Sequence, residues 1–395
     1  MTAKPIMLSK VDWDPRFSIA SAKDVLTPAL VIYPKIVQSN VDRTLEILNG
    51  DASRWRVHIK TAKLGYTLRL LVARNVRAFK CATTLELLTA CQNGAQDVLV
   101  AYPVMGANAY RVATISEQFP DVRISVLVEN DNQLRQWCGS KVGIFLDINP
   151  GMNRTGIDQG RTEDVLAALR SIRELGLEFR GLHYYDGQYG GLPWGERLTA
   201  AHAGYDRLLQ LTAKITATGV TIPEVVTAGT PTFPCSLAYP GFLNQNFIHR
   251  VSPGTIIYND ATSLAQLPRD YGYAPGALVL ARVVSHPAPP IVTCDAGHKA
   301  VSADAGIPTC LVAGNNGLTA LSPSEEHLPL AVSEGTPVPA VGDLLYLLPR
   351  HVCPTVNNFD HALIVDGGQI IAVENVTARG HEAPMVAQAI ARTTS

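Results

Sequence analysis

The sequence predicts a (β/α)8 barrel followed by a β-rich domain. Strand and helix patterns alternate from residue 25 to residue 265, and a succession of such units is typical of this barrel. After residue 265 the pattern changes to strands joined by Pro/Gly turns, with few helix signals. The 31 glycines and 26 prolines also disfavour an all-helical fold. A doubly wound parallel sheet is the alternative, because strands are difficult to count from one sequence.

Short runs of β-branched and aromatic residues predict the barrel strands. Between them, apolar residues recur at helical spacing, for example from 36 to 48 ahead of Gly50 and from 161 to 175 ahead of Gly176. The predicted strands are residues 29–33, 55–60, 78–83, 97–103, 123–128, 142–148, 179–185 and 224–229.

The expected domain limits are residues 25–265 for the barrel and 266–395 for the β-rich domain. The N-terminal segment 1–24 is a candidate addition to the second domain. The strands of that domain are expected within 276–287, 289–297, 343–352 and 361–380.

Charge and cysteine content favour a small-molecule partner. The 33 basic and 34 acidic residues nearly cancel, and no basic run appears, so nucleic acid is not expected to bind. The N-terminus lacks the features of a signal peptide, and no apolar run approaches the roughly 20 residues of a membrane span. We therefore expect a soluble, cytoplasmic protein with no membrane partner. Seven cysteines without framework spacing predict reduced thiols.

Chemistry in such a barrel takes place at the carboxyl ends of the strands. Lys60 ends one predicted strand, where a lysine can act as a nucleophile or base. Arg154 lies in a loop between glycines, and the strand 179–185 ends near polar and aromatic side chains. Taken alone, each of these is more simply an ordinary surface or core residue.

A further loop, "TAGTPT", contains Gly229 and Thr230 and is of the small-residue kind that wraps a phosphate with backbone N–H groups. A lysine, a phosphate loop, stackable aromatics and an arginine together describe a pyridoxal-phosphate site.

His351 and Cys353 lie two positions apart in "PRHVCPTVN". On an extended strand this spacing aims both side chains to the same side, as metal ligands require. The alternative is a buried cysteine beside an ordinary histidine.

The joint order of "RVHIKTAK", "GMNRTG", "TAGTPT", "VSPGTIIYND", "CDAGHKAVSAD" and "HVCPTVN" resembles the D-threonine aldolase and zinc-dependent D-serine dehydratase family. These are fold-type III pyridoxal-phosphate enzymes related to alanine racemase, and the resemblance runs from about residue 25 to about residue 365. It implies a barrel that holds the cofactor, a β-domain that supplies a metal site, and a homodimer that shares the active site.

The resemblance also implies roles for single residues. Lys60 matches the lysine that bonds pyridoxal phosphate, and Arg154 matches the arginine near its phenolic oxygen. Gly229 and Thr230 match the phosphate loop, and Tyr258 matches a tyrosine that often reaches the phosphate. His183 and Tyr185 lie on the strand whose side chains line the cofactor ring.

His351 and Cys353 match the metal pair of the dehydratases, whereas aldolases tend to have an aspartate in the second position. Thiolate with imidazole suits zinc, with manganese or another divalent ion as the alternative.

The implied function is a pyridoxal-phosphate- and metal-dependent lyase that acts on a 3-hydroxy D-amino acid. Cys353 favours β-elimination to a 2-oxo acid and ammonia. Retro-aldol cleavage to glycine and an aldehyde is the alternative, followed by an amino-acid racemase or a non-catalytic pyridoxal-phosphate-binding protein. The identity of the hydroxy amino acid and the roles of His327 and Asp186 stay open.

Overall fold

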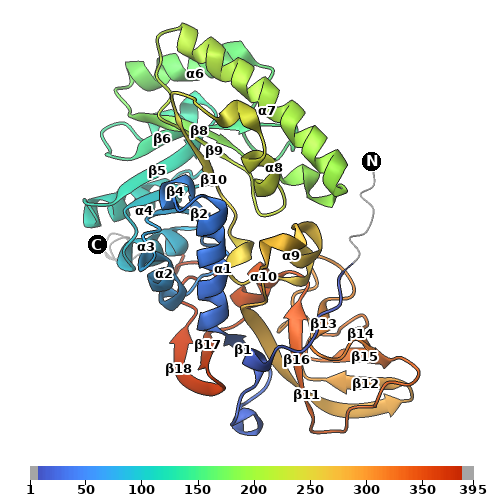
Figure 1. Ribbon diagram of the computed structural model, residues 1–395. Coiled ribbons are helices and arrows are strands. Elements are labelled where there is room, and N and C mark those ends of the chain that lie inside the picture. Colours follow the sequence, from blue (N-terminus) through green and yellow to red (C-terminus); the bar gives the residue numbers. More distant parts are fainter. Residues whose placement is uncertain (1–7, 385–395) are drawn as a thin grey trace, which may run out of the picture.

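The structure, a computed structural model, describes residues 8–384. A parallel barrel forms one lobe and a β-rich sheet forms the other, with the helices α9 (Ala261–Gln266) and α10 (Val352–Asn357) between them (Figure 1). The family of folds expected from the sequence is therefore confirmed. None of the helices in this part of the chain has the length and apolarity that a bilayer crossing requires.

Parallel strands form the wall of the barrel, and a parallel bridge between Trp55 and Val251 joins its first and last strands. In spatial order, the wall in the described residues consists of the eight strands β2 (Val57–His58), β3 (Ala78–Cys81), β4 (Asp97–Val100), β5 (Arg123–Val128), β6 (Gly143–Asn149), β8 (Phe179–Tyr184), β9 (Glu224–Thr227) and β10 (Ile248–Val251). The short β7 (Ile157–Asp158) pairs with the end of β6.

Helices cover the outside of the barrel because each has one apolar face. In α6 (Thr162–Glu174) the buried residues Val165, Ala168, Leu169 and Ile172 follow helical spacing. The other barrel helices are α1 (Pro34–Ile47), α2 (Gly65–Val72), α3 (Thr84–Gln92), α4 (Ala107–Gln118), α5 (Asp131–Arg135), α7 (Trp194–Ala217) and α8 (Phe233–Leu237). Short 3-10 turns at Gly187–Gly191 and Thr255–Ile257 lie in loops after barrel strands.

The prediction that residues 29–33 form the first barrel strand is wrong. They form β1 (Ala29–Ile32), which pairs antiparallel with β11 (Ala277–Ala288) and parallel with β17 (His361–Asp366) in the other sheet. A short buried apolar strand has the same local pattern in either sheet, so its partners are set by distant segments. The other domain limits stay predictions.

The eighth wall strand, β10, was missed because its sequence, "IHRV", places His249 and Arg250 in its centre. Both side chains face neighbours inside the molecule rather than solvent: His249 is buried, and Arg250 lies near two carboxylates. Polar residues in the interior of a strand hide the apolar pattern by which strands are found.

The β-rich sheet has the order β14-β15-β12-β11-β1-β17-β18, and β16 and β13 extend from β11 on a branch. The N-terminal segment packs here, since Val11 and Phe17 share a buried cluster with Leu278 and Leu280. The strands not yet given are β12 (Ile291–Cys294), β13 (Cys310–Val312), β14 (Leu318–Ala320), β15 (Leu328–Val332), β16 (Leu344–Pro349) and β18 (Gln369–Asn375).

The two lobes share a core where α10 meets the barrel. Val352 and Val356 are fully buried in the same apolar cluster as the barrel strands. This contact at α10 brings the segment with His351 and Cys353 to the carboxyl ends of the barrel strands.

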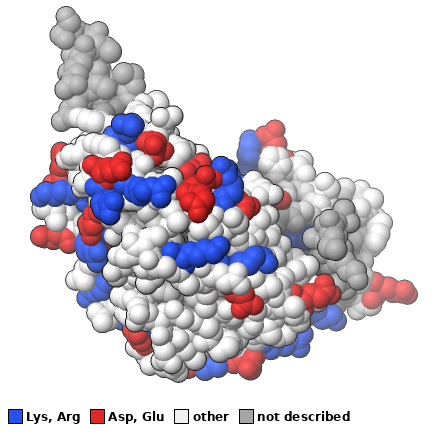
Figure 2. Space-filling view, turned by 90° about the horizontal axis from the view of Figure 1, so that it is seen from above, with Lys and Arg blue, Asp and Glu red and all other residues white. Residues whose placement is uncertain are grey.

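On the outside, Figure 2 shows Lys and Arg side chains interspersed with Asp and Glu over one face.

Candidate active site

A cavity of about 250 Å³ lies at the carboxyl ends of the barrel strands, next to α10. Sites for drug-sized ligands begin at roughly 300 Å³, so this volume suits a small ligand with one ring. The predicted residues among those that line it are Lys60, Tyr185, Gly229, Thr230 and His351. Most of its other lining residues come from the ends of β2 and β3, the loop after β10 and the start of α9: His58, Lys80, Pro231, Ser252, Gly254, Thr255, Asp260, Thr262, Ser263, Gln266 and Ala305.

Lys60 lies in a turn whose C-terminal end, at Lys63, is fixed by an ion pair and a backbone hydrogen bond. The backbone N–H of Lys60 donates to His58 Nδ1 at 3.3 Å. Three residues on, Lys63 adopts a left-handed conformation, and its ammonium pairs with Glu86 at 2.6 Å. The Lys63 carbonyl accepts a hydrogen bond from the N–H of Ala378. The ion pair and the C-terminal segment therefore fix the loop that presents Lys60.

The ring of Tyr185 lies between two cations and two glycines. The Arg154 guanidinium lies 4.7 Å from the ring centroid, and Lys80 Nζ lies 5.8 Å from it. A Cβ added to Gly187 or Gly229 would come within 2.6 or 2.8 Å of ring atoms. Glycine is therefore required at both positions for the ring to occupy this place.

Two loops meet at the other side of the cavity, where a phosphate is expected. The Thr230 hydroxyl accepts a hydrogen bond from the Thr255 N–H at 3.1 Å, which joins the loop after β9 to the loop after β10. Gly254 permits the second loop to approach β2, because an added Cβ would lie 2.2 Å from the His58 carbonyl oxygen. The N–H groups of Gly229 and Thr255 donate to the hydroxyls of Thr232 and Thr230, so a bound phosphate would replace these bonds in order to use them.

Asp186, to which the sequence assigned no role, holds the first of these loops. Its buried carboxylate accepts hydrogen bonds from the hydroxyls of Thr232 and Tyr205. Burial raises the pKa of this carboxyl above its ordinary value, despite both hydrogen bonds. Asp186 therefore acts on the shape of the loop and does not line the cavity.

The floor of the cavity contains a lysine that the sequence reasoning missed. Lys80 is 3% exposed, and its Nζ lies 3.4 Å from Nε2 of the buried His183. Burial, with the charges of Lys60 and Arg154, lowers the pKa of Lys80 to about 7. The available signal was one lysine within the otherwise apolar strand 78–81.

Two histidines near Lys80 are held neutral. Burial and the charge of Lys80 lower the pKa of His183, although Asp147 accepts a hydrogen bond from its Nδ1 at 2.8 Å. Burial and the charges of Lys60 and Lys80 hold the pKa of His58 well below its ordinary value.

His351 and Cys353 converge, but not on the extended strand that the prediction assumed. His351 is the N-cap residue of α10 and Cys353 lies in its first turn. The turn from strand to helix brings the two side chains within hydrogen-bonding distance. Three neighbours fix them. Asp304 Oδ2 lies 2.6 Å from His351 Nδ1, Asp260 accepts from the Val352 N–H at 3.0 Å, and Thr61 Oγ1 lies 2.9 Å from Cys353 Sγ.

The two side chains form a thiolate–imidazolium pair. Burial alone would lower the pKa of His351, but Cys353 and Asp304 raise it to about 9, so a bound metal would displace the proton of His351. Burial alone would raise the pKa of the Cys353 thiol, but the hydrogen bond and charge of His351 outweigh it and the pKa is lowered. Thiolate and imidazole together fit a borderline-soft divalent cation. Within residues 8–384 no group of three or more His, Cys, Asp or Glu is placed to hold a metal ion, so the pair would leave coordination positions open.

Among the predicted residues, Arg154, His183 and Cys353 do not line the cavity themselves but contact the lining residues Tyr185, Lys80 and Thr255. Tyr258 and His327 are not in the lining either. The Tyr258 side chain is buried; its hydroxyl donates to the Ala62 carbonyl at 3.1 Å and lies 2.7 Å from the Thr67 hydroxyl. It thus supports the loop of Lys60, and its contact with a phosphate stays a prediction. His327 is exposed at the start of β15.

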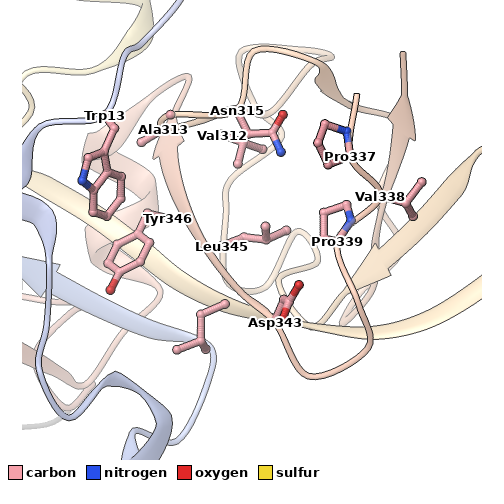
Figure 3. Close-up of a pocket in the computed structure, with 12 residues that line it drawn as sticks. Trp13, Val312, Ala313, Asn315, Pro337, Val338, Pro339, Asp343, Leu345 and Tyr346 are labelled. Carbon is pink, nitrogen blue, oxygen red and sulfur yellow. The ribbon is translucent and has the colours of Figure 1, made fainter. Parts of the chain in front are cut away.

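A larger hollow, of about 560 Å³, opens on the β-rich lobe and contains none of the predicted site residues. Trp13 and Tyr346 face each other on one side of it and Pro337, Val338 and Pro339 form the other (Figure 3). Its carboxylate, Asp343, accepts a hydrogen bond from the Ala340 N–H at 2.8 Å. Chemistry is better supported in the smaller cavity, where amines, imidazoles and a thiol converge.

Comparison with protein families matches both lobes. The model described as "Alanine racemase, N-terminal domain" matches residues 32–262, and the model described as "Putative serine dehydratase domain" matches residues 276–365. The first match alone covers more than half of the chain.

Relatives extend over nearly the whole chain. D-threonine aldolase of Arthrobacter sp is 26% identical over 370 residues, which is 90% of this chain and 93% of that protein. 3-Hydroxy-D-aspartate aldolase of Paracoccus denitrificans (strain Pd 1222) is 27% identical over 370 residues, with the same coverage. D-threo-3-hydroxyaspartate dehydratase of Delftia sp. (strain HT23) is 24% identical over 371 residues, which is 86% of this chain and 95% of that protein.

Solved structures of other proteins have the same fold. The crystal structure of D-threonine aldolase from Filomicrobium marinum aligns with a TM-score of 0.82 at 26% identity and covers 95% of this chain and 99% of that one. An alanine racemase of Clostridium difficile 630 aligns with a TM-score of 0.63 at 15% identity over 89% of this chain and 99% of that one, a likeness of fold alone.

Proposed function

We infer the reaction from one premise: the chain belongs to the D-threonine aldolase and D-serine dehydratase-like family of pyridoxal-phosphate-dependent lyases, whose barrel is an alanine racemase N-terminal domain. We propose that it eliminates water from a 3-hydroxy D-amino acid and yields a 2-oxo acid and ammonia. The observation that carries this choice is Cys353, which lies beside His351 at the position where the resemblance to the dehydratases implies a metal ligand, and whose thiol pKa is lowered.

The cavity supports pyridoxal phosphate as the cofactor. No salt bridge joins Lys60, Lys80 or Arg154 to a carboxylate in residues 8–384, so this end of the barrel has positive charge that an anionic cofactor would balance. Lys60 would hold the cofactor, Gly229 and Thr230 its phosphate, and Arg154 its phenolic oxygen, with Tyr185 and His183 beside the ring. When bound, the cofactor supplies an electron sink for the carbanion at the α-carbon of the substrate.

Lys60 is also the base that the proposal requires. With a substrate in the cavity, Lys60 Nζ would be placed to remove the α-proton. The anchored turn of Lys60 keeps the amine in the cavity, and the loop after β9, held by Asp186, keeps the opposite wall in place.

His351 and Cys353 would hold a divalent metal, and zinc is the proposed ion. Such a metal supplies Lewis acidity at the β-hydroxyl of the substrate, which is otherwise a poor leaving group. Asp304 and Asp260 orient the pair, and Thr61 joins Cys353 to the loop of the cofactor lysine.

Retro-aldol cleavage to glycine and an aldehyde is the second candidate, and the aldolase names of relatives at 26% and 27% identity favour it. A racemase is a weaker candidate because it would not require His351 and Cys353. A pyridoxal-phosphate carrier of barrel type would not require a second lobe with its own sheet. We also propose a homodimer, on family resemblance, and sedimentation of the purified protein tests it.

Product analysis tests the reaction. D-Threonine, D-serine and D-threo-3-hydroxyaspartate are supplied to metal-free and zinc-loaded protein, and to the Cys353→Ala variant. The proposal predicts a 2-oxo acid with ammonia from the zinc-loaded protein, and about 100-fold less from the other two.

Glycine with an aldehyde would replace the dehydratase by the aldolase. Appearance of the enantiomer, with exchange of the α-proton, would favour the racemase. Full activity after exhaustive chelation would remove the metal from the proposal.

A further inference from the structure

Lys80 crosses the interior of the barrel beneath the candidate cofactor cavity. It lies on β3, and its Nζ reaches His183 and the ring of Tyr185, which lie at the end of β8. In the order of the wall, β4, β5 and β6 separate β3 from β8. The lysine therefore spans the lumen, and it lines the cavity together with Lys60.

A chain of hydrogen bonds fixes the direction in which Lys80 donates. The Asp147 carboxylate lies 2.8 Å from His183 Nδ1 and accepts a second bond from the Thr155 hydroxyl at 2.7 Å. Because a carboxylate accepts, His183 Nδ1 carries the proton and Nε2 has the free lone pair. Lys80 Nζ therefore donates one hydrogen bond to His183 Nε2, and its remaining N–H groups are available to a partner in the cavity.

The charged groups around Lys80 are mostly positive. Lys60 comes from the turn after β2, Arg154 from the loop after β6, and Arg56 lies below in the lumen. Two carboxylates also face it: Asp147 on β6 raises the pKa of Lys80, and the charge of Lys80 acts on Asp186, which follows β8. His58 and the ring of Tyr185 complete the surroundings. With its pKa at about 7, the amine is mostly neutral in weakly alkaline solution when no anion occupies the cavity.

The geometry points to Lys80 as a second cationic contact for the phenolic oxygen of pyridoxal phosphate, beside Arg154, which takes up a proton when the cofactor binds. The inference rests on the proposed function. Lys80 and Arg154 lie at the ring of the same tyrosine, whereas the loops suited to the phosphate follow β9 and β10. With the phosphate at the loops after β9 and β10, the anionic oxygen of the cofactor that would lie near Lys80 and Arg154 is the phenolic oxygen.

Proton uptake on binding tests this role without turnover. The probe is pyridoxine 5′-phosphate, which has the phenolic oxygen and the phosphate but no aldehyde, so it cannot bond to Lys60. Its binding to the cofactor-free full-length protein is measured by calorimetry at about pH 8, in two buffers of different ionisation enthalpy. The difference in heat between the buffers counts the protons exchanged.

Three variants give the comparison. We expect Lys80→Met to bind the probe about tenfold or more weakly and to take up nearly one proton fewer than the natural protein. Lys80→Arg, which is always charged, should bind without this uptake. The control is Lys141→Met, the same change at an exposed lysine, and it should match the natural protein.

The outcomes distinguish a failure of the role proposed for Lys80 from a failure of the proposed function. Equal uptake and affinity in the natural protein and Lys80→Met would overturn the role of Lys80 and leave the cofactor site intact. Full uptake in Lys80→Arg would overturn it as well, and this variant decides the question if Lys80→Met does not fold. Failure of the natural protein to bind either the probe or pyridoxal phosphate would overturn the proposed function itself.

Discussion

The two ends of the barrel interior treat buried charge in opposite ways. At the amino end, Arg56 is almost fully buried and forms paired hydrogen bonds of 2.7–2.9 Å with Glu224 and Asp97. Arg250 lies 3.4 and 3.5 Å from the same two carboxylates. Two cations therefore meet two anions. Burial alone would lower the pKa of Arg56, but the carboxylates raise it, and Arg56 in turn helps to lower the pKa of Asp97.

At the carboxyl end, no salt bridge pairs Lys60, Lys80 or Arg154 with a carboxylate among residues 8–384. Lys60, Lys80 and Arg154 converge there, and Asp147 reaches Lys80 through His183. A buried charge is costly unless it is paired, so the paired set is explained by stability, whereas the set without salt bridges suits the binding of an anion. In this barrel, incomplete pairing of cationic side chains therefore indicates the site better than burial or cavity size does.

The largest expected effect is at Lys60. Lys60→Ala should reduce turnover on the order of a thousandfold or more and abolish the visible absorbance of the bound cofactor, because it removes the amine that holds the cofactor and takes the proton. The midpoint of urea unfolding should change little, as no ion pair is lost. Activity, absorbance and unfolding of Lys141→Ala serve as the control. An unchanged cofactor spectrum in Lys60→Ala would remove Lys60 from its role.

At the amino end of the barrel we expect a large change in stability and a small change in turnover. Arg56→Met removes the cation that forms hydrogen bonds with both Asp97 and Glu224, and Arg250 and Arg123 act on Asp97 only through their charge. We therefore expect a loss of about 3–5 kcal/mol in the free energy of unfolding. Turnover per folded molecule should stay close to that of the natural protein. Chemical denaturation measures the loss, and Arg170→Met on the exposed face of α6 is the matched control. Unchanged stability would refute the view that this network is structural.

The smallest expected effect is at Lys80 and depends on pH. Lys80→Met should stabilise the cofactor-free protein by about 2 kcal/mol near pH 6, because it removes an unpaired buried cation. The pKa of Lys80 falls from 10.5 to about 7 on folding, so the unfolded chain binds more protons between these values. The natural protein should therefore gain stability as pH rises through this window, and the variant should lack the gain.

Urea unfolding at about pH 6 and about pH 9 measures this difference. An equal rise in stability with pH in both proteins would show that Lys80 is charged in the folded state over the whole window.

Much of the site could be predicted because its elements are local. The loop "TAGTPT" follows β9, Lys60 follows β2 and Tyr185 follows β8, and parallel strands present their carboxyl ends on one face. The same reasoning failed for β1, whose partners β11 and β17 lie more than 200 residues away. It also missed β10, where polar residues in the strand face the interior.

Periodicity and turn residues, which act over a few positions, were enough to predict seven of the eight strands of the barrel wall and the residues that follow them. Only the tertiary structure decided which sheet receives β1, that Lys80 points into the lumen toward His183, and that Tyr258 supports the loop of Lys60. It also decided that His351 and Cys353 meet at the start of a helix. The physical reason is that these features depend on barrel closure and on contacts between distant segments, for which no short pattern exists.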